Sequence, residues 1–176
     1  MELINKLERS VTGWLKPLPN LPKSAQKWLA ENVWWLALIS AILTGISILV
    51  LIGSITAYSA YVSPAAGYNT VGFNAYAPGW ILSSAISLVF SVVIVVLTAL
   101  AVTPLKLKTK KGWTLLFIIY AISAIEVVVN AVLSFSVIGF IFGIIFGGIG
   151  LAIGGYFLLQ IKSYFGSTVK AKHVTK

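Results

Sequence analysis

The chain has 176 residues, of which 59% are hydrophobic and only 10% are charged, with a mean hydropathy of +0.97. A soluble domain carries roughly 25% charged residues, so this composition excludes a soluble globule and indicates an integral membrane protein. There is no cysteine, which excludes disulfides, thiolate metal sites and a cysteine nucleophile, and the net charge is +9.

Residues 1–32 form a polar segment before the first long apolar run. Within residues 1–16 the apolar side chains gather on one face of a helix; they are Leu3, Ile4, Leu7, Val11, Trp14 and Leu15. This pattern predicts an amphipathic helix in the membrane interface, its apolar face toward the lipid. Pro17 and Pro19 end that helix, and a second short helix over about 22–31 could run into the first span. We expect the amphipathic helix to anchor the protein; docking of a partner is the alternative.

Residues 33–57 and 80–102 are the first two predicted transmembrane helices. A bilayer-crossing helix needs about 20 apolar residues, and both runs reach that length without a charged residue. A signal peptide is the alternative for the first run, but the apolar core of a signal peptide is only about 7–15 residues long. Each span carries small hydroxyl residues on one face, which favour helix packing in lipid; they are Ser40, Thr44, Ser47 and Ser54, then Ser84, Ser87, Ser91 and Thr98.

The third apolar run, residues 113–161, is too long for one span and contains a single charged residue, Glu126. We expect it to form two helices, over 113–133 and 137–161, joined by a tight turn near residues 133–137. The four spans together define a transmembrane domain over 33–161.

Glu126 lies about two-thirds of the way along the third span. Ser123 and Asn130 share its helical face, so the three residues form a candidate intramembrane polar site. Because no span contains a lysine or arginine to pair with it, we expect the carboxyl to be uncharged and hydrogen-bonded to Asn130 or to a serine of the first two spans. The alternative is a proton-binding or cation-binding site in a small transporter, since intramembrane acids often mark such pathways.

The fourth span contains a row of glycines at spacings of four, four, three and four: Gly139, Gly143, Gly147, Gly150 and Gly154. Gly148 and Gly155 lie on a second face. Repeated GxxxG units let helix backbones approach closely in lipid. We therefore predict a helix-packing surface, which could receive a neighbour from the same chain, another copy or both; contact with a lipid tail is the alternative.

All 13 basic residues lie in three segments: the N-terminal segment, the loop between the second and third spans, and the tail 162–176. The opposite side, residues 58–79 and the short turn after the third span, carries no charge. Basic loops remain in the cytoplasm, so we expect a multi-pass protein of the cytoplasmic (plasma) membrane with both termini inside. The lysines also predict contact with anionic lipid at the cytoplasmic face, and they explain the net charge without nucleic acid.

Three stretches carry a resemblance: "KLERSVTGWLKPLPNLPKSAQKWL" near the start, "LKLKTKKGWTLLFIIY" before the third span, and "GGYFLLQIKSYF" at the end of the fourth. They resemble small four-span membrane proteins of unassigned function from bacteria with reduced genomes, over about a third of the chain. The resemblance implies a four-span fold and supplies no activity or site residues. Four spans with one membrane glutamate are also similar to small multidrug transporters, but in those the carboxylate lies in the first span, whereas Glu126 is in the third.

The acids and the one histidine are scattered along the chain and form no catalytic or metal-binding constellation; they are Glu2, Glu8, Glu31, Glu126 and His173. We therefore expect no enzymatic activity and no cofactor. The expected fold is an all-α bundle of four transmembrane helices with an amphipathic interfacial helix at the N-terminus. The expected role is a structural or interaction subunit that packs through small-residue helix faces, with homo-oligomerisation an open question. The alternative is a small proton-coupled transporter or a lipid-handling protein that uses Glu126.

Overall fold

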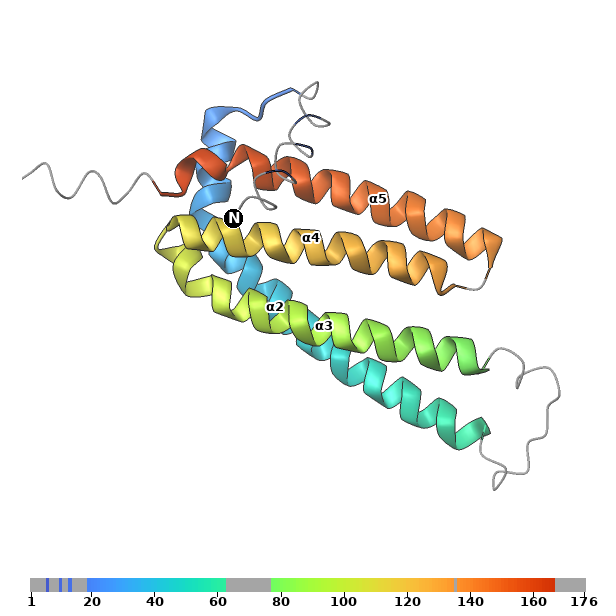
Figure 1. Cartoon of the computed structure of the whole chain (residues 1–176). Coiled ribbons are helices and arrows are strands. Elements are labelled where there is room, and N and C mark those ends of the chain that lie inside the picture. Colours follow the sequence, from blue (N-terminus) through green and yellow to red (C-terminus); the bar gives the residue numbers. More distant parts are fainter. Residues whose placement is uncertain are drawn as a thin grey trace, which may run out of the picture.

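The computed structural model describes residues 19–62, 77–134 and 136–166, together with Lys6, Ser10 and Gly13. The helices over these ranges are α2 (Lys23–Val62), α3 (Ala77–Lys106), α4 (Lys110–Val132), α5 (Val137–Gln160) and the short 3-10 helix η2 (Lys162–Tyr164) (Figure 1). The protein is an all-α four-helix bundle, which confirms the fold class predicted from the sequence. The predicted amphipathic helix and the tail after Gly166 lie largely outside the described residues.

Four helices are long and apolar enough to cross a membrane: Lys23–Ala60, Ile81–Lys106, Lys110–Val132 and Val137–Tyr164. Their outward surfaces expose many large apolar side chains, among them Leu49, Val89 and Phe146. Exposure of so large an apolar surface to water is unfavourable, whereas the hydrocarbon of a bilayer solvates it. These are the properties of a multi-pass integral membrane protein.

Helix α2 is one continuous helix of 40 residues, so the short helix expected over about 22–31 and the first span are a single element. Neither glycine nor proline interrupts residues 23–44, and the helix therefore has no local reason to break. At 1.5 Å per residue α2 is roughly 60 Å long, about twice the hydrocarbon thickness of a bilayer. Its polar start, with Lys23, Lys27 and Glu31, therefore lies beyond the hydrocarbon or in the interface.

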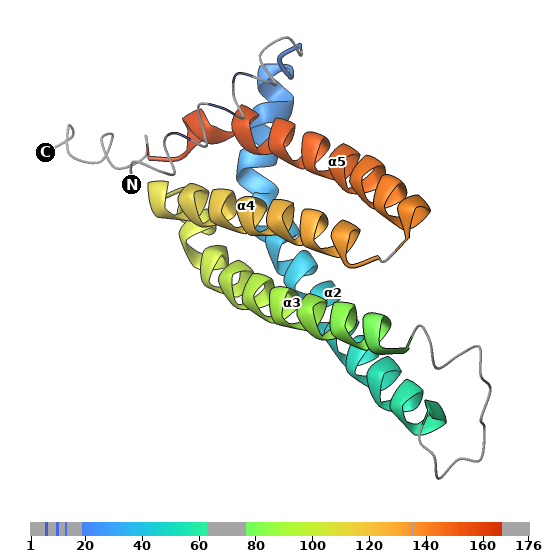
Figure 2. The same ribbon diagram turned by 45° about the vertical axis from the view of Figure 1, so that its right-hand side comes forward.

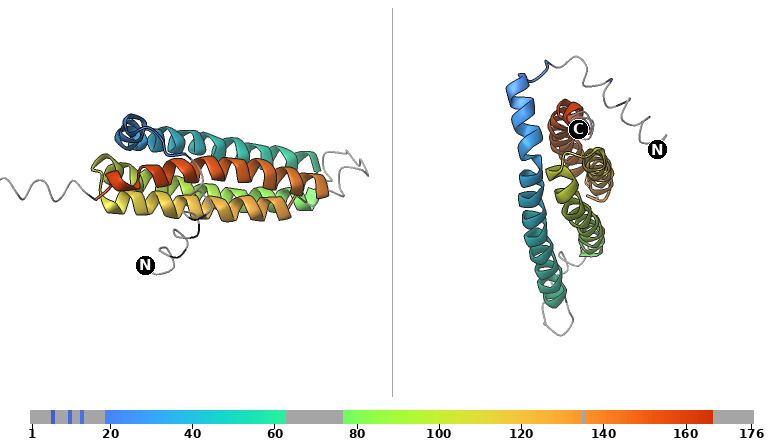
Figure 3. Two further views of the ribbon diagram at one scale, coloured as in Figure 1. Left: turned by 90° about the horizontal axis from the view of Figure 1, so that it is seen from above. Right: turned by 90° about the vertical axis from the view of Figure 1, so that its left-hand side faces the viewer.

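The helices pack in chain order: α2 against α3, α3 against α4, and α4 against α5. Figures 1 and 2 show them spread like a fan, with α2 and α5 at its two edges. The right-hand view of Figure 3 shows α2 running away from α5 over most of its length. Among the described helices, α4 is therefore the main neighbour of α5.

The buried core lies at one end of the bundle, where α2 and α4 begin and α3 and α5 end. We call this the basic end, because every lysine between residues 19 and 166 is located there; they are Lys23, Lys27, Lys106, Lys108, Lys110, Lys111 and Lys162. The largest core side chains are Leu105, Trp113, Phe117, Leu158, Ile161 and Phe165. The indole N–H of Trp113 donates to the carbonyl of Leu158 at 3.1 Å, which joins α4 to the end of α5.

A tight turn joins α3 to α4 at the basic end. A β-carbon on Gly112 would lie 2.7 Å from the carbonyl carbon and oxygen of Pro104, so only glycine permits this approach. Thr109 caps α4 by accepting a hydrogen bond from the Gly112 N–H at 3.3 Å. Gly166, with φ of +94°, donates its N–H to the carbonyl of Lys108 at 3.0 Å and so closes the chain after η2 onto this turn.

Candidate functional site

A polar contact joins α3 to α4 in the half of the bundle away from the basic end. The hydroxyl of Ser87 donates to the amide oxygen of Asn130 at 2.9 Å. Together with the approach of Gly112 to Pro104, this bond sets the antiparallel register of the two helices. One turn further along each helix, the register places Ser91 at the level of Glu126. We refer to Ser87, Ser91, Glu126 and Asn130 as the polar seam.

Glu126 is half-buried and has no hydrogen-bond or ion-pair partner among the described residues. Of the two kinds of partner expected for Glu126, Asn130 is not bonded to it in the described structure, where the Asn130 amide oxygen accepts a hydrogen bond from Ser87. At 100° per residue Glu126 is displaced about 40° from Asn130, on the side of the seam away from α5. Ser123 is half-buried on the same stripe of α4. The carboxyl therefore lies at the edge of the helix contact.

The depth of Glu126 follows from its position along α4. At 1.5 Å per residue it lies roughly 24 Å from the start of the helix at Lys110 and roughly 9 Å from its end at Val132. It is thus closer to the charge-free face of the membrane than to the basic end.

The glycines of α5 that face α4 follow one inclined row. A β-carbon on Gly143 would lie 3.2 Å from the Ala131 methyl group, and one on Gly147 would collide with Val127. Further along, a β-carbon on Gly155 would lie 2.6 Å from the Tyr120 hydroxyl oxygen. That hydroxyl donates to the carbonyl of Leu151 at 3.0 Å. Residues 143, 147, 151 and 155 repeat every four residues and form the ridge of α5 that packs closely against α4.

Of the predicted stripe, Gly150 and Gly154 are not part of the α4 contact within the described residues. Gly150 has no heavy atom within 4 Å of an added β-carbon, and Gly154 has only a Tyr120 ring carbon at 4.0 Å. Gly139 contacts Ser134 of the turn rather than α4 itself. The reason is geometric: each step of four residues rotates the contact by about 40° around α5. By the end of α5 the contact has moved from the Gly154 face to Gly155.

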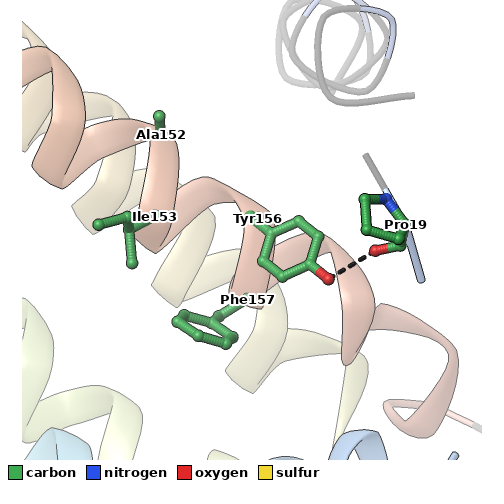
Figure 4. Close-up of a pocket in the computed structure, with 5 residues that line it drawn as sticks. All are labelled: Pro19, Ala152, Ile153, Tyr156 and Phe157. Atoms are coloured by element: carbon green, nitrogen blue, oxygen red, sulfur yellow. Dashed lines mark hydrogen bonds between the residues drawn. The ribbon is translucent and has the colours of Figure 1, made fainter. Parts of the chain in front are cut away.

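A pocket of about 340 Å³ lies beside α5 near the basic end, lined by Pro19, Ala152, Ile153, Tyr156 and Phe157 (Figure 4). Tyr156 is one residue after Gly155, which places it about 100° around α5 from the α4 contact at that level. Its hydroxyl donates to the carbonyl of Pro19 at 2.6 Å and closes one side of the pocket. The remaining lining is apolar, so the site suits a hydrocarbon ligand.

Hydrogen bonds hold residues 19–26 against the end of α5. Gln26 donates through its amide to the side-chain oxygen of Gln160 at 2.8 Å, and Gln160 donates to the side-chain oxygen of Asn20 at 3.1 Å. The hydroxyl of Tyr164 donates to the carbonyl of Lys23 at 3.4 Å. One wall of the pocket is therefore fixed by contacts between the two ends of the described chain.

The lysines of the basic end differ in their partners. Lys106 lies 5.1 Å above the Trp34 ring, Lys162 lies 5.0 Å above the Trp113 ring, and Lys108 pairs with Glu31 at 3.5 Å. In contrast, the ammonium groups of Lys23 and Lys27 are exposed and contact no acid or aromatic ring in the described part of the chain. These two cations, one turn apart, are available to an external anion.

Tyr120, Trp113 and the pocket residues were not predicted from the sequence. The contact between Tyr120 and Gly155 could have been suggested by an aromatic residue on one helix and a glycine on the next. However, a single sequence does not give the helix register that brings the two together. Among the described residues no three histidine, cysteine, aspartate or glutamate side chains lie close enough to hold a metal ion. In comparisons with protein-family models, curated proteins and solved structures, no match to this chain was found.

Proposed function

We propose that this chain is a non-enzymatic subunit of the cytoplasmic (plasma) membrane, structural or interacting, which associates with a further copy through a small-residue face of α5. The observation that carries this proposal is the open pair Gly150 and Gly154. Both are exposed, and an added β-carbon would have no heavy atom closer than 4.0 Å. The α4 contact uses Gly143, Gly147 and Gly155 instead.

An open Gly150-xxx-Gly154 pair is suited to a second helix. In lipid, burial of apolar surface does not drive association, and helices pair where small residues let their backbones approach. Among the described helices α5 packs against α4 alone over most of its length, so its Gly150 face is suited to receive α5 of another copy. A motif of this kind is weak evidence by itself, and its openness in the folded chain is what supports the proposal.

Energy transfer between two populations of labelled protein in lipid vesicles tests the association. We expect transfer for the natural sequence, loss of transfer for Gly150→Leu, and no loss for Gly53→Leu. Gly53 is a matched control, since it also has no atom within 4 Å of an added β-carbon but lies on α2. Gly147→Leu is a less specific probe, because leucine there would also collide with Val127 inside the fold. A natural protein that shows no transfer, or a Gly150→Leu variant that retains it, would overturn the proposal.

We also propose that the basic end faces the cytoplasm, where its lysines meet anionic lipid, and that nucleic acid is not a partner. The grouping of all lysines of residues 19–166 at that end supports this orientation. The chain has no cysteine, so single cysteines can report each side. Ser136→Cys at the α4–α5 turn should react with an impermeant maleimide on intact cells, and Ser163→Cys at the basic end only after permeabilisation. The reverse pattern would refute the orientation.

A small proton-coupled transporter or a lipid-handling protein is the alternative function. The observation that favours it is that Glu126 lacks a partner in the described structure and lies at the level of Ser91 on the polar seam. Proton flux into vesicles containing the protein, measured with a pH-sensitive dye, tests the transporter. Flux that is present in the natural protein and lost in a folded Glu126→Gln variant would support it, and equal flux in both would exclude a role for the carboxyl.

A further inference from the structure

We infer that the pocket beside α5 binds an acyl chain of an anionic phospholipid, whose phosphate lies against Lys23 and Lys27. The inference deepens the proposed lipid contact and rests on the membrane location of the chain. It does not depend on association between copies.

The pocket lining selects a hydrocarbon. Pro19, Ala152, Ile153 and Phe157 present apolar side chains, and the Tyr156 hydroxyl is already bonded to the Pro19 carbonyl at 2.6 Å. The one polar side-chain group of the lining, the Tyr156 hydroxyl, therefore already donates its proton within the protein. The volume of about 340 Å³ is within the range of small-molecule pockets, and one flexible chain can fill it.

The position of the pocket matches the depth at which acyl chains meet their headgroups. Its α5 residues, Ala152 to Phe157, lie roughly 5 to 12 Å before the end of the helix at Gln160, at 1.5 Å per residue. The polar residues Asn20, Gln26 and Gln160 form a hydrogen-bonded layer just beyond it. A chain lying in the pocket would therefore place its ester and phosphate groups beside this layer.

The charge beside this layer is positive. Gln26 faces α5 through its bond to Gln160, and Lys23 and Lys27 lie within one turn of Gln26, about 60° and 100° around α2 from it. Like charges one helical turn apart repel each other, and a phosphate between them would relieve the repulsion. The other lysines for which the structure gives contacts, Lys106, Lys108 and Lys162, pair with an acid or an aromatic ring. An anionic headgroup is therefore favoured over a zwitterionic one.

Hydrogen bonds within the protein hold the pocket wall in place. Tyr156, Gln160 and Tyr164 of the α5 end hold Pro19, Asn20 and Lys23 by hydrogen bonds. A pre-organised wall reduces the ordering cost of binding. This distinguishes the pocket from the exposed apolar surface around it, which touches bulk lipid without selecting it.

Photo-crosslinking of the full-length protein in mixed vesicles tests the inference. A benzophenone amino acid replaces Ile153 in the pocket or, as a control, Ile145 on the same helix; the two isoleucines are 54% and 50% exposed. The vesicles contain phosphatidylcholine with a minor fraction of phosphatidylglycerol, and mass spectrometry identifies the adducts. At position 153 we expect phosphatidylglycerol to be enriched about fivefold for each lysine it engages, and at position 145 to match its bulk fraction.

Two further variants make the outcome decisive. In Lys23→Gln and Lys27→Gln the enrichment at position 153 should fall toward the bulk fraction, while Lys111→Gln, another exposed lysine of the basic end, should leave it unchanged. Equal enrichment at 145 and 153, or enrichment that survives both glutamine variants, would overturn the inference. Adducts at 153 to residues 1–18 or to a second copy would overturn it too, since the occupant would then be protein. Loss of lipid selectivity would leave the energy-transfer test of association unaffected.

Discussion

Tyr120 of α4 occupies the space beside Gly155 of α5 in which a β-carbon would otherwise lie. A β-carbon at Gly155 would be 2.6 Å from the Tyr120 hydroxyl oxygen and 3.0 Å from Cζ of the ring. The hydroxyl donates to the Leu151 carbonyl at 3.0 Å, one turn earlier on α5. Glycine costs a helix about 1 kcal/mol relative to alanine in water. At this position it permits a hydrogen bond between two helices inside the membrane.

The pair predicts a non-additive response. Tyr120→Phe should cost about 1 kcal/mol by loss of the interhelical hydrogen bond, and Gly155→Ala about 1 to 3 kcal/mol by crowding. In the double variant the hydroxyl no longer obstructs the methyl group, so the total cost should be smaller than the sum. Unfolding by sodium dodecyl sulfate, followed by circular dichroism, measures all three. Gly148→Ala is the control, since its β-carbon would meet open space, and strict additivity would contradict the contact.

The α3–α4 turn should be the least tolerant site for an added methyl group. In Gly112→Ala the new carbon would lie 2.7 Å from the Pro104 backbone, which has no flexible end to move aside. We expect a loss of about 2 kcal/mol or more. Gly45→Ala on α2 adds the same methyl group to open space and should be neutral or slightly stabilising. Thermal denaturation in detergent micelles compares the two, and equal melting temperatures would show that the turn is looser than described.

The Ser87–Asn130 bond should contribute modestly to the α3–α4 contact. Ser87→Ala and Asn130→Ala should each cost about 1 kcal/mol or less, with a coupling energy near 0.6 kcal/mol, as is typical of interhelical hydrogen bonds in lipid. A double-mutant cycle on the free energy of unfolding measures the coupling. Ser47→Ala is the control, because its hydroxyl bonds the Leu43 carbonyl of its own helix. A coupling energy indistinguishable from zero would mean that the two side chains do not stabilise each other.

Glu126→Leu should stabilise the isolated chain, by about 1 kcal/mol or more, because it removes a polar group that has no partner in the described structure and adds apolar surface. Glu126→Gln should be nearly neutral. The comparison is Glu31→Leu, which removes the partner of Lys108 and, as an exposed pair, should cost less than about 1 kcal/mol. Detergent-induced unfolding of the monomer reports all three. A marked loss of stability in Glu126→Leu would reveal a bonding partner for the carboxyl that lies outside the described residues.

The sequence predicted the type of fold because that depends on composition and run length. Four apolar stretches of sufficient length must be helices in lipid, where every backbone group needs an internal partner. The turn between the last two helices, residues 133–136, falls within the residues expected to form it. From the sequence, the short helix over about 22–31 could run into the first span, but no residue required it. Pro22 marks where a helix can begin, and nothing marks how far it continues.

The side-chain contacts could not be predicted in the same way, because they depend on the crossing of two helices. A single sequence shows that Gly150 and Gly155 are both on α5, but not which of them faces α4. Likewise, the sequence does not show which polar residue of α4 a serine of α3 will bond. The register of the two helices places Ser87 opposite Asn130. Helix α5 contacts α4 along a row that repeats every four residues, and not along the predicted spacings of four, four, three and four. This row determines which glycines contact α4 and leaves Gly150 and Gly154 outside that contact.

Packing in chain order has a consequence for how the protein is assembled during synthesis. The α2–α3 and α4–α5 hairpins each join neighbours in sequence, so each can form as soon as its second helix has entered the bilayer. The bonds from Asn20 and Gln26 to Gln160 join residues far apart in the chain. They can form only after nearly all of the described chain has left the ribosome. Helix α5, which is translated after α2, α3 and α4, therefore completes the wall of the pocket, and a chain truncated before Gln160 would lack both of these bonds.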